Sequence, residues 1–440
     1  MIKDIAITKN NGNVIRGIAF VPDDCNGAYP TVIFSHGFNG NYKGLMHHGN
    51  EYAENNIVCI FFDFCGGGVE SSSDGRFEDM TLMTEIEDLE DVINAISQYD
   101  YVDPNRLFLQ GESMGGFVSA YVAASHPELI KALILWYPAF VISDDSRKRI
   151  EAGDNTCFGL QLNSEFNTIA ANIDIYEHIV KYTNPIRIIH GDMDNIVPLE
   201  YSKRAIEVCK RAELIVVPGA GHGYDGDDSD NARRQSMEFI IDNVNNILID
   251  NIVRLEFSAF DKVRNEGGRA SCQNDFKTFS VMRRSQYMSW NRTMLEQYLS
   301  DFVSANASGR NMIMEKYAYM MESTSPEEYA KIRDKLPGVD ADSKAIIEQI
   351  VAIQISMMEE YADTHKDIAS RARSIHSSED TAYNTSYETY LRGELSTYSG
   401  EMLALYAGYV IDAARNGVNL SETIIGNTLE LYGVKDAIKG

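Results

Sequence analysis

Ser113 lies in a sequence that is typical of an activated serine. It is the centre of a Gly-x-Ser-x-Gly motif at 111–115, which follows an apolar run at 106–110 and opens a helical pattern at 114–126. Such a turn between strand and helix exposes the serine hydroxyl on a sharp bend, and the helix N-terminus favours the negative charge that develops on an attacked carbonyl. The motif therefore predicts acyl transfer through a covalent intermediate on Ser113.

A serine hydroxyl needs a base within hydrogen-bond reach, and the base needs an acid that orients it. His222 follows the apolar run 214–217 and has the position expected for the base. The loop after the preceding strand offers Asp192 and Asp194. We favour Asp194, because it lies further into the loop and can turn toward His222, whereas Asp192 is expected to bind local backbone amides. His190, at the end of that strand, is expected to be structural.

The oxyanion of an acyl-transfer intermediate needs two N–H donors. We expect one from the main-chain amide of Met114, directly after the nucleophile. The second is expected from Phe38, in the loop after the apolar run 31–35, where His36 and Gly37 shape the turn. Loss of one such donor typically costs about 2.7–4 kcal/mol of transition-state stabilisation.

The elements that must position these residues are short apolar runs alternating with helical patterns. Continuous apolar strands are typical of a parallel sheet covered on both faces, so we expect a doubly wound α/β domain. Strands are expected at 31–35, 57–62, 106–110, 132–136, 186–189 and 214–217. Helices are expected at 82–98, 114–126, 199–211 and 232–249. An opening hairpin, 3–9 and 13–20 with Asn11-Gly12 at its turn, would add antiparallel edge strands.

Strand signals stop in the second half of the chain. Ser325 and Pro326 begin a helix as its N-cap and first residue. Other helical segments are expected in 275–306, 341–376, 385–416 and 420–431. We therefore expect two domains, an α/β domain at 1–250 and an all-α domain at 251–440, with a boundary near 248–256.

Residues 1–248 resemble serine α/β-hydrolases, specifically the bacterial feruloyl and cinnamoyl esterases. The resemblance rests on His36-Gly37-Phe38, on Asp74-Gly75-Arg76-Phe77-Glu78-Asp79-Met80-Thr81-Leu82, on Gly111-Glu112-Ser113-Met114-Gly115-Gly116, on His190-Gly191-Asp192-Met193-Asp194 and on Gly221-His222-Gly223-Tyr224. It implies the α/β-hydrolase fold, with Asp194 as the acid, His222 as the base and a lid over the acyl pocket at about 140–184. The loop 66–73 looks longer than its usual counterpart in that family.

The reaction that this resemblance implies is hydrolysis of a carboxylic ester of a small acyl or aromatic acid, through an acyl-enzyme on Ser113. The scheme needs no metal and no organic cofactor. A thioesterase, an acyltransferase or an amidase would use the same triad. A further alternative is a bifunctional protein, whose helical domain carries a separate small-molecule activity or binds a partner.

A group of polar residues early in the helical domain does not follow the apolar stripe of a helix. These residues could line a second, polar ligand pocket: Arg269, Cys272, Gln273, Arg283 and Gln286. In the structural alternative Gly267-Gly268 is a turn, Asn274 or Asp275 caps a helix, and the arginines pair with acidic residues. The domain resembles an uncharacterised bacterial family of unknown function, numbered 4125, and this resemblance implies no chemistry.

The charge excludes polyanionic partners. The 440 residues carry a net charge of −26, and residues 1–250 hold 18 Lys and Arg against 38 Asp and Glu. Nucleic acids and anionic lipid surfaces require clustered Lys and Arg, so neither is expected as a partner. The acidic segment 225–230 lacks the glycine and closing glutamate of an EF-hand, and we expect a solvated loop there rather than a metal site.

The start of the chain lacks the basic and apolar regions of a secretory signal, and no window holds 18 uninterrupted apolar residues. The six cysteines are scattered without a C-x-x-C pair, which indicates free thiols in a reducing compartment. We therefore expect a cytoplasmic enzyme that acts on a small-molecule ester and has no membrane partner. The sequence does not determine the oligomeric state, and a homo-oligomer is one possibility.

Overall fold

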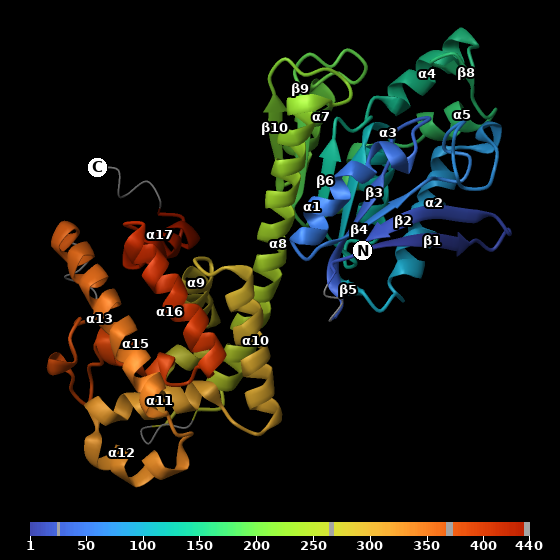
Figure 1. Cartoon of the computed structure of the whole chain (residues 1–440). Coiled ribbons are helices and arrows are strands. Elements are labelled where there is room, and N and C mark those ends of the chain that lie inside the picture. Colours follow the sequence, from blue (N-terminus) through green and yellow to red (C-terminus); the bar gives the residue numbers. More distant parts are fainter. Residues whose placement is uncertain (24–26, 264–267, 367–372, 435–440) are drawn as a thin grey trace. The chain divides into compact units, whose positions relative to one another are not determined.

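Two compact units make up the chain, Met1–Val244 and Asn245–Gly440 (Figure 1). The computed structural model describes residues 1–23, 27–263, 268–366 and 373–434.

The first unit is built on an eight-stranded sheet with the order β1-β2-β4-β3-β5-β6-β9-β10. Its strands are β1 (Ile2–Thr8), β2 (Val14–Phe20), β3 (Tyr29–Ser35), β4 (Val58–Phe62), β5 (Val102–Glu112), β6 (Ile130–Trp136), β9 (Ile186–Gly191) and β10 (Ala212–Val217). β1, β2 and β4 pair antiparallel, and every other neighbouring pair is parallel. The predicted opening hairpin and mostly parallel sheet are confirmed.

Helices pack on both faces of this sheet, as the burial of its central strands requires. All seven residues of β3 are buried, and Trp136 at the end of β6 donates a 2.9 Å hydrogen bond to Oγ of Ser236 on a covering helix. The helices are α1 (Gly49–Glu54), α2 (Leu82–Ile96), α3 (Ser113–Ser125), α7 (Glu200–Val208) and α8 (Gly226–Phe260). The segment 140–184 holds α4 (Ile142–Ala152), the ribbon β7 (Thr156–Cys157) and β8 (Leu160–Gln161), α5 (Phe166–Ala171) and α6 (Ile175–Ile179).

The predicted helix 232–249 is too short at both ends. α8 runs from Gly226 to Phe260 and belongs to both units. It begins within the acidic segment that we expected to be a loop, because Asp227 and Asp228 in its first turn are favourable at a helix N-terminus. After Gly226 the sequence holds neither glycine nor proline up to Phe260, so no local signal ends the helix earlier.

The second unit is helical, as predicted. After the end of α8 come α9 (Phe276–Tyr287), α10 (Arg292–Ala307), α11 (Met312–Thr324), α12 (Pro326–Ile332), α13 (Ala341–Thr364), α15 (Tyr387–Leu395), α16 (Gly400–Arg415) and α17 (Leu420–Leu431).

Two long helices predicted for this unit are shorter in the structure. The stretch 385–416 is broken at Ser396–Ser399, where hydroxyl groups bind backbone carbonyls and Ser399 caps α16. Such side-chain hydrogen bonds compete with the helical ones and favour a cap over continuation. Within the stretch 341–376 the helix α13 ends at Thr364, and residues 367–372 lie outside the described residues.

Candidate active site

Ser113 occupies the turn between β5 and α3 with a backbone φ of +49°, in the left-handed region. This bend requires small neighbours. A Cβ on Gly111 would lie 2.3 Å from the carbonyl oxygen of Gly115, and a Cβ on Gly115 would lie 2.3 Å from that of Ser35. A strained φ at a non-glycine residue is typical of functional sites, and Ser113 is half-buried here.

Ser113, His222 and Asp194 are brought together by three separate loops. Nε2 of His222 lies 2.9 Å from Oγ of Ser113, and Nδ1 of the same ring lies 2.7 Å from Oδ2 of Asp194. The loops that carry Asp194 and His222 meet because they follow β9 and β10, which are parallel neighbours. Gly191 is paired with Val217, so the carboxyl ends of these two strands lie side by side. Both distances are within hydrogen-bond range for a nucleophile, a base and an orienting acid.

The carboxylate of Asp194 is fully buried and stabilised in its charged form. Burial raises the pKa of this group, but hydrogen bonds from His190, from His222 and from backbone amides outweigh it and hold the pKa well below its usual range. Its Oδ1 accepts hydrogen bonds from the amides of Ile196 at 2.9 Å and Val197 at 2.8 Å. Asp194 therefore stays ionised beside the imidazole.

His190, expected to be structural, touches the same carboxylate. Its Nε2 lies 3.2 Å from Oδ2 of Asp194 and 2.9 Å from the carbonyl oxygen of Val197, and its Nδ1 lies 2.7 Å from Oγ of Ser202. These contacts fix the loop that carries Asp194. Asp192 instead accepts a 2.6 Å hydrogen bond from the amide of Gly219, so its carboxylate joins the two loops.

The loop after β3 passes close to Ser113. A Cβ on Gly37 would lie 3.2 Å from Cβ of Ser113. His36 fixes this loop from below, since its Nδ1 lies 2.8 Å from the carbonyl of Gly37 and its Nε2 accepts from the amide of Phe64 at 3.3 Å. Burial lowers the pKa of His36, which keeps the ring neutral for this pair of contacts. Met114 lies in the first turn of α3, where amides have no partner within the helix.

Three aromatic rings beside this loop were not assigned a role in the sequence. The ring of Phe38 contacts Phe77 at 5.6 Å and Phe158 at 6.0 Å between centroids. Phe158 belongs to the segment 140–184 and is 72% exposed. A large aromatic side chain left in solvent is a surface that an apolar ligand can cover. The sequence offered little indication of this contact, because Phe158 belongs to no recognisable motif.

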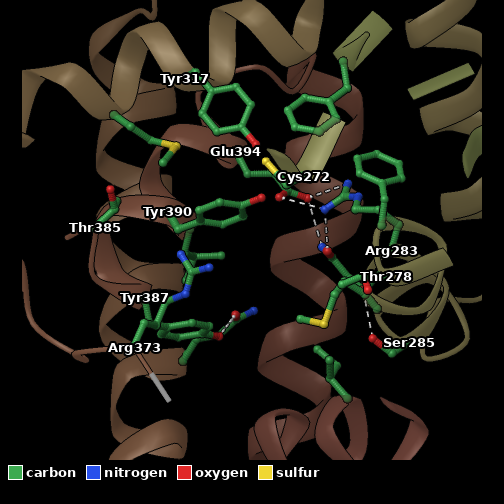
Figure 2. A pocket seen from close by; sticks show the side chains of 18 of the residues that line it. Cys272, Thr278, Arg283, Ser285, Tyr317, Arg373, Thr385, Tyr387, Tyr390 and Glu394 are labelled. Atoms are coloured by element: carbon green, nitrogen blue, oxygen red, sulfur yellow. Dashed lines mark hydrogen bonds and ion pairs between the residues drawn. The ribbon is translucent and has the colours of Figure 1, made fainter. Parts of the chain in front are cut away.

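The five residues predicted for a second pocket fall into two groups. Cys272, Arg283 and Gln286 line a cavity in the second unit (Figure 2). Gln273 is buried and donates hydrogen bonds to the carbonyls of Phe260 at 2.8 Å and Val263 at 3.0 Å.

Arg269 binds the carbonyl of Gln273 at 2.9 Å and pairs with Asp261. The pairing of Arg269 with an acidic residue matches the structural alternative, whereas Gln273, which that alternative did not mention, binds backbone at and just after the end of α8.

Across the part of the chain that the structure describes, no three His, Cys, Asp or Glu side chains gather as a metal site requires. Among the same residues no helix is long and apolar enough to cross a bilayer.

Two family models match the two halves of the chain. Residues 47–246 match the prolyl oligopeptidase family, and residues 246–439 match a protein family of unknown function, DUF4125. The uncharacterized protein YfhR of Escherichia coli O157:H7 is 26% identical over 250 residues, which cover 55% of this chain and 82% of that protein.

The mouse protein named mitochondrial palmitoyl-protein thioesterase ABHD10 is 26% identical over 203 residues, or 42% of this chain and 64% of that protein. The structure of Est1E from Butyrivibrio proteoclasticus with bound ferulic acid is 25% identical, with a TM-score of 0.49 over 55% of this chain and 99% of that chain. The chain joins an α/β-hydrolase domain to a DUF4125 domain.

Proposed function

We propose that Ser113, His222 and Asp194 form the catalytic triad of a serine hydrolase that cleaves carboxylic esters of small acyl or aromatic acids. The observation that carries this proposal is the continuous line of contacts from Oγ of Ser113 through His222 to Asp194, at 2.9 and 2.7 Å. The left-handed backbone of Ser113 supports the same role, because the strain exposes the nucleophile.

The reaction follows from these contacts. Oγ of Ser113 attacks the ester carbonyl while its proton passes to Nε2 of His222, and the ionised Asp194 stabilises the imidazolium that forms. The amides of Phe38 and Met114 receive the oxyanion. The alcohol then leaves with the proton from His222. Water, deprotonated by the same ring, attacks the acyl-enzyme and releases the acid with restoration of Ser113.

A direct test compares Ser113→Ala with Ser125→Ala, a substitution at an exposed serine on the same helix. With p-nitrophenyl acetate we expect kcat/KM to fall at least about 10³-fold in the first variant and to stay unchanged in the second. A fluorophosphonate probe should label the wild-type protein at Ser113 and leave Ser113→Ala unlabelled. If wild type and Ser113→Ala hydrolyse a panel of esters equally, the proposed function fails.

The acyl group is proposed to lie against Phe38, Phe77 and Phe158, with the segment 140–184 as the lid that carries Phe158. An aromatic acyl group would gain ring contacts that acetate cannot make. Phe158→Ala should therefore raise KM for a p-nitrophenyl cinnamate several-fold and leave KM for p-nitrophenyl acetate unchanged. An equal effect on both esters would show that Phe158 does not select the acyl group.

A thioesterase is the second candidate, because a protein 26% identical over 203 residues is named a palmitoyl-protein thioesterase. The triad would act in the same way on a thioester, whose leaving group is a thiol. A matched pair of substrates, an octanoyl oxygen ester and an octanoyl thioester, separates the two candidates. A kcat/KM for the thioester more than tenfold above that for the oxygen ester would favour the thioesterase, and a peptide amide in the same series tests amidase activity.

A further inference from the structure

The second unit contains a cavity of about 640 Å³, within the size range of small-molecule sites. Its walls come from helices that are far apart in sequence, and several aromatic rings line them (Figure 2). The rings that bear on the argument are those of Phe260, Phe279, Tyr317, Tyr387 and Tyr390. Cys272, in the turn Ser271–Asn274, lies at the same cavity and is exposed.

One wall of the cavity is charged but satisfied within the protein. The buried guanidinium of Arg283 binds Glu256 through two hydrogen bonds of 2.7 and 2.8 Å and Glu394 through two of 3.1 Å. Its remaining contacts are Oε1 of Gln286 at 2.9 Å and the hydroxyl of Tyr287. An arginine has five N–H donors on three nitrogen atoms, and all three nitrogens of Arg283 donate in these contacts. Arg283 therefore organises the wall and has no donor left for a ligand.

Lys316 pairs with Glu394 of this wall and makes the buried charge cluster neutral. Its ammonium lies 2.5 Å from Oε2 of Glu394 and 3.8 Å from the centre of the Tyr390 ring. The two cations, Arg283 and Lys316, thus balance the two buried carboxylates, Glu256 and Glu394.

Arg373 differs from these residues, because no described residue balances its charge. Its guanidinium carbon lies 4.6 Å from the centre of the Tyr390 ring, and the residue is exposed at the cavity (Figure 2). Among the described residues no carboxylate lies within ion-pair distance of it. The ring of Tyr390 therefore has two cations against it, and one of them can still bind an anion.

The electrostatic potential at the hydroxyl of Tyr390 is positive, which also favours an anion. Burial raises the pKa of a tyrosine, but the charges of Lys316 and Arg283 outweigh burial and lower the pKa of Tyr390. A cationic ligand would meet Arg373 and Lys316 at the ring face that it needs for a cation–π contact. An anion would instead pair with the guanidinium of Arg373, because this group can bind a carboxylate through two hydrogen bonds.

We propose that this cavity is a binding site for an aromatic carboxylate, whose carboxylate pairs with Arg373 and whose ring packs among Tyr390, Tyr387 and Phe279. The acidic Asp275 also lines the cavity, and its carboxylate is engaged as the cap of α9 through the amide of Thr278 at 3.0 Å. The site lies within the second unit and does not depend on the chemistry proposed for Ser113.

The test is calorimetric titration of the full chain with three matched probes: 3-phenylpropanoate, 3-phenylpropanamide and 3-phenylpropan-1-amine. We expect the carboxylate to bind at least tenfold more tightly than the amide and the amine not to bind. Octanoate has the carboxylate and an apolar chain but no ring, so it tests whether the aromatic ring contributes to binding. It should bind at least fivefold more weakly than 3-phenylpropanoate. Equal affinity for the amine and the carboxylate would overturn the proposal, and equal affinity for octanoate would overturn its aromatic part.

Location is tested with Arg373→Gln and a matched control, Arg415→Gln, which removes an exposed arginine of the same unit. The first should weaken 3-phenylpropanoate binding at least fivefold without changing Tm, and the second should leave the affinity unchanged. A peptide-resolved assay of Cys272 alkylation by iodoacetamide gives a second readout, since bound 3-phenylpropanoate should slow it. Unchanged affinity in Arg373→Gln together with unprotected Cys272 would place the ligand elsewhere and refute the site.

Discussion

The phenol of Tyr137 donates a 2.9 Å hydrogen bond to Oε2 of Glu112, the residue directly before Ser113. The ring of Tyr137 also packs against the ring of His222, with 4.7 Å between centroids. One buried tyrosine therefore contacts both the residue directly before Ser113 and the proposed base. Burial, followed by the charge of Glu112, raises the pKa of Tyr137 far above its usual value, so the phenol remains a donor.

Tyr137→Phe should lower both stability and activity. The variant keeps the ring against His222 but removes a hydrogen bond to a charged acceptor, which is worth about 1.5–3 kcal/mol. Glu112 also accepts a hydrogen bond from the amide of Gly37 at 3.4 Å. When Glu112 loses its contact with residue 137, we expect the loop that holds Gly37 to shift beside Ser113 and kcat to fall several-fold. Urea unfolding and ester hydrolysis measure the two effects.

The control for this variant is Tyr182→Phe, which removes a buried hydroxyl that donates to the neutral carbonyl of Ile130 at 3.1 Å. It should cost about 1 kcal/mol and leave kcat unchanged. A Tyr137→Phe protein with the kcat of wild type would show that the contact with Glu112 has no bearing on the site.

Asp194→Asn and Asp192→Asn should separate the two carboxylates of the same loop. An amide at 194 cannot stabilise the imidazolium of His222, and such a change typically lowers kcat about 10⁴-fold. Asp192 bonds to the amide of Gly219 instead, so Asp192→Asn should lower Tm with less than a tenfold change in kcat. The opposite ranking of kcat in the two variants would assign the acid to Asp192.

The sequence predicted the parts of this site that local spacing governs. Ser113 and His222 each follow an apolar run, and the carboxyl ends of parallel strands meet at one edge, so their proximity follows from fold class alone. The role of His190 at Asp194 could not be predicted, because it depends on a side-chain direction within a loop. Tyr137 was missed because its contact joins the residue after β6 to Glu112 at the end of β5, and these residues are far apart in sequence.

In the second half of the chain the sequence predicted both ends of α17 and the start of α12, but not the ends of the longer helices. The length of α8 was missed because no glycine or proline marks the boundary between the units. Arg373 was not considered as a ligand contact, because its relation to Tyr390 is visible only in three dimensions.

Glu85→Gln should stabilise the protein at neutral pH. Glu85 is completely buried on α2, and neither carboxyl oxygen has a hydrogen-bond partner among the described residues. Burial, together with the charge of Asp88, raises its pKa well above the usual value, so the folded state holds a proton that the unfolded state releases. Stability contributed by this group is thus present at low pH and is lost as pH rises above the unfolded-state pKa.

The measurement is Tm between pH 4 and pH 8 for wild type, Glu85→Gln and the exposed control Glu87→Gln on the same helix. We expect the advantage of Glu85→Gln over wild type to grow with pH and the control to follow wild type. A pH-independent difference between Glu85→Gln and wild type would contradict the raised pKa.

Glu394→Gln should destabilise the second unit far more than Glu348→Gln. Burial raises the pKa of Glu394, but Arg283 and Lys316 outweigh burial and hold the pKa well below its usual range, so its stabilising effect is present above the unfolded-state pKa and is lost as pH falls. Removing one partner of a buried ion pair costs about 3–5 kcal/mol, because the cations are left unpaired. Glu348 pairs with Arg392 at the surface, where such a pair contributes about 0–1 kcal/mol. Urea unfolding at pH 7 gives the free energy of unfolding of both variants. Equal losses would mean that the ion pairs of Glu394 with Arg283 and Lys316 do not stabilise the second unit more than a surface pair does.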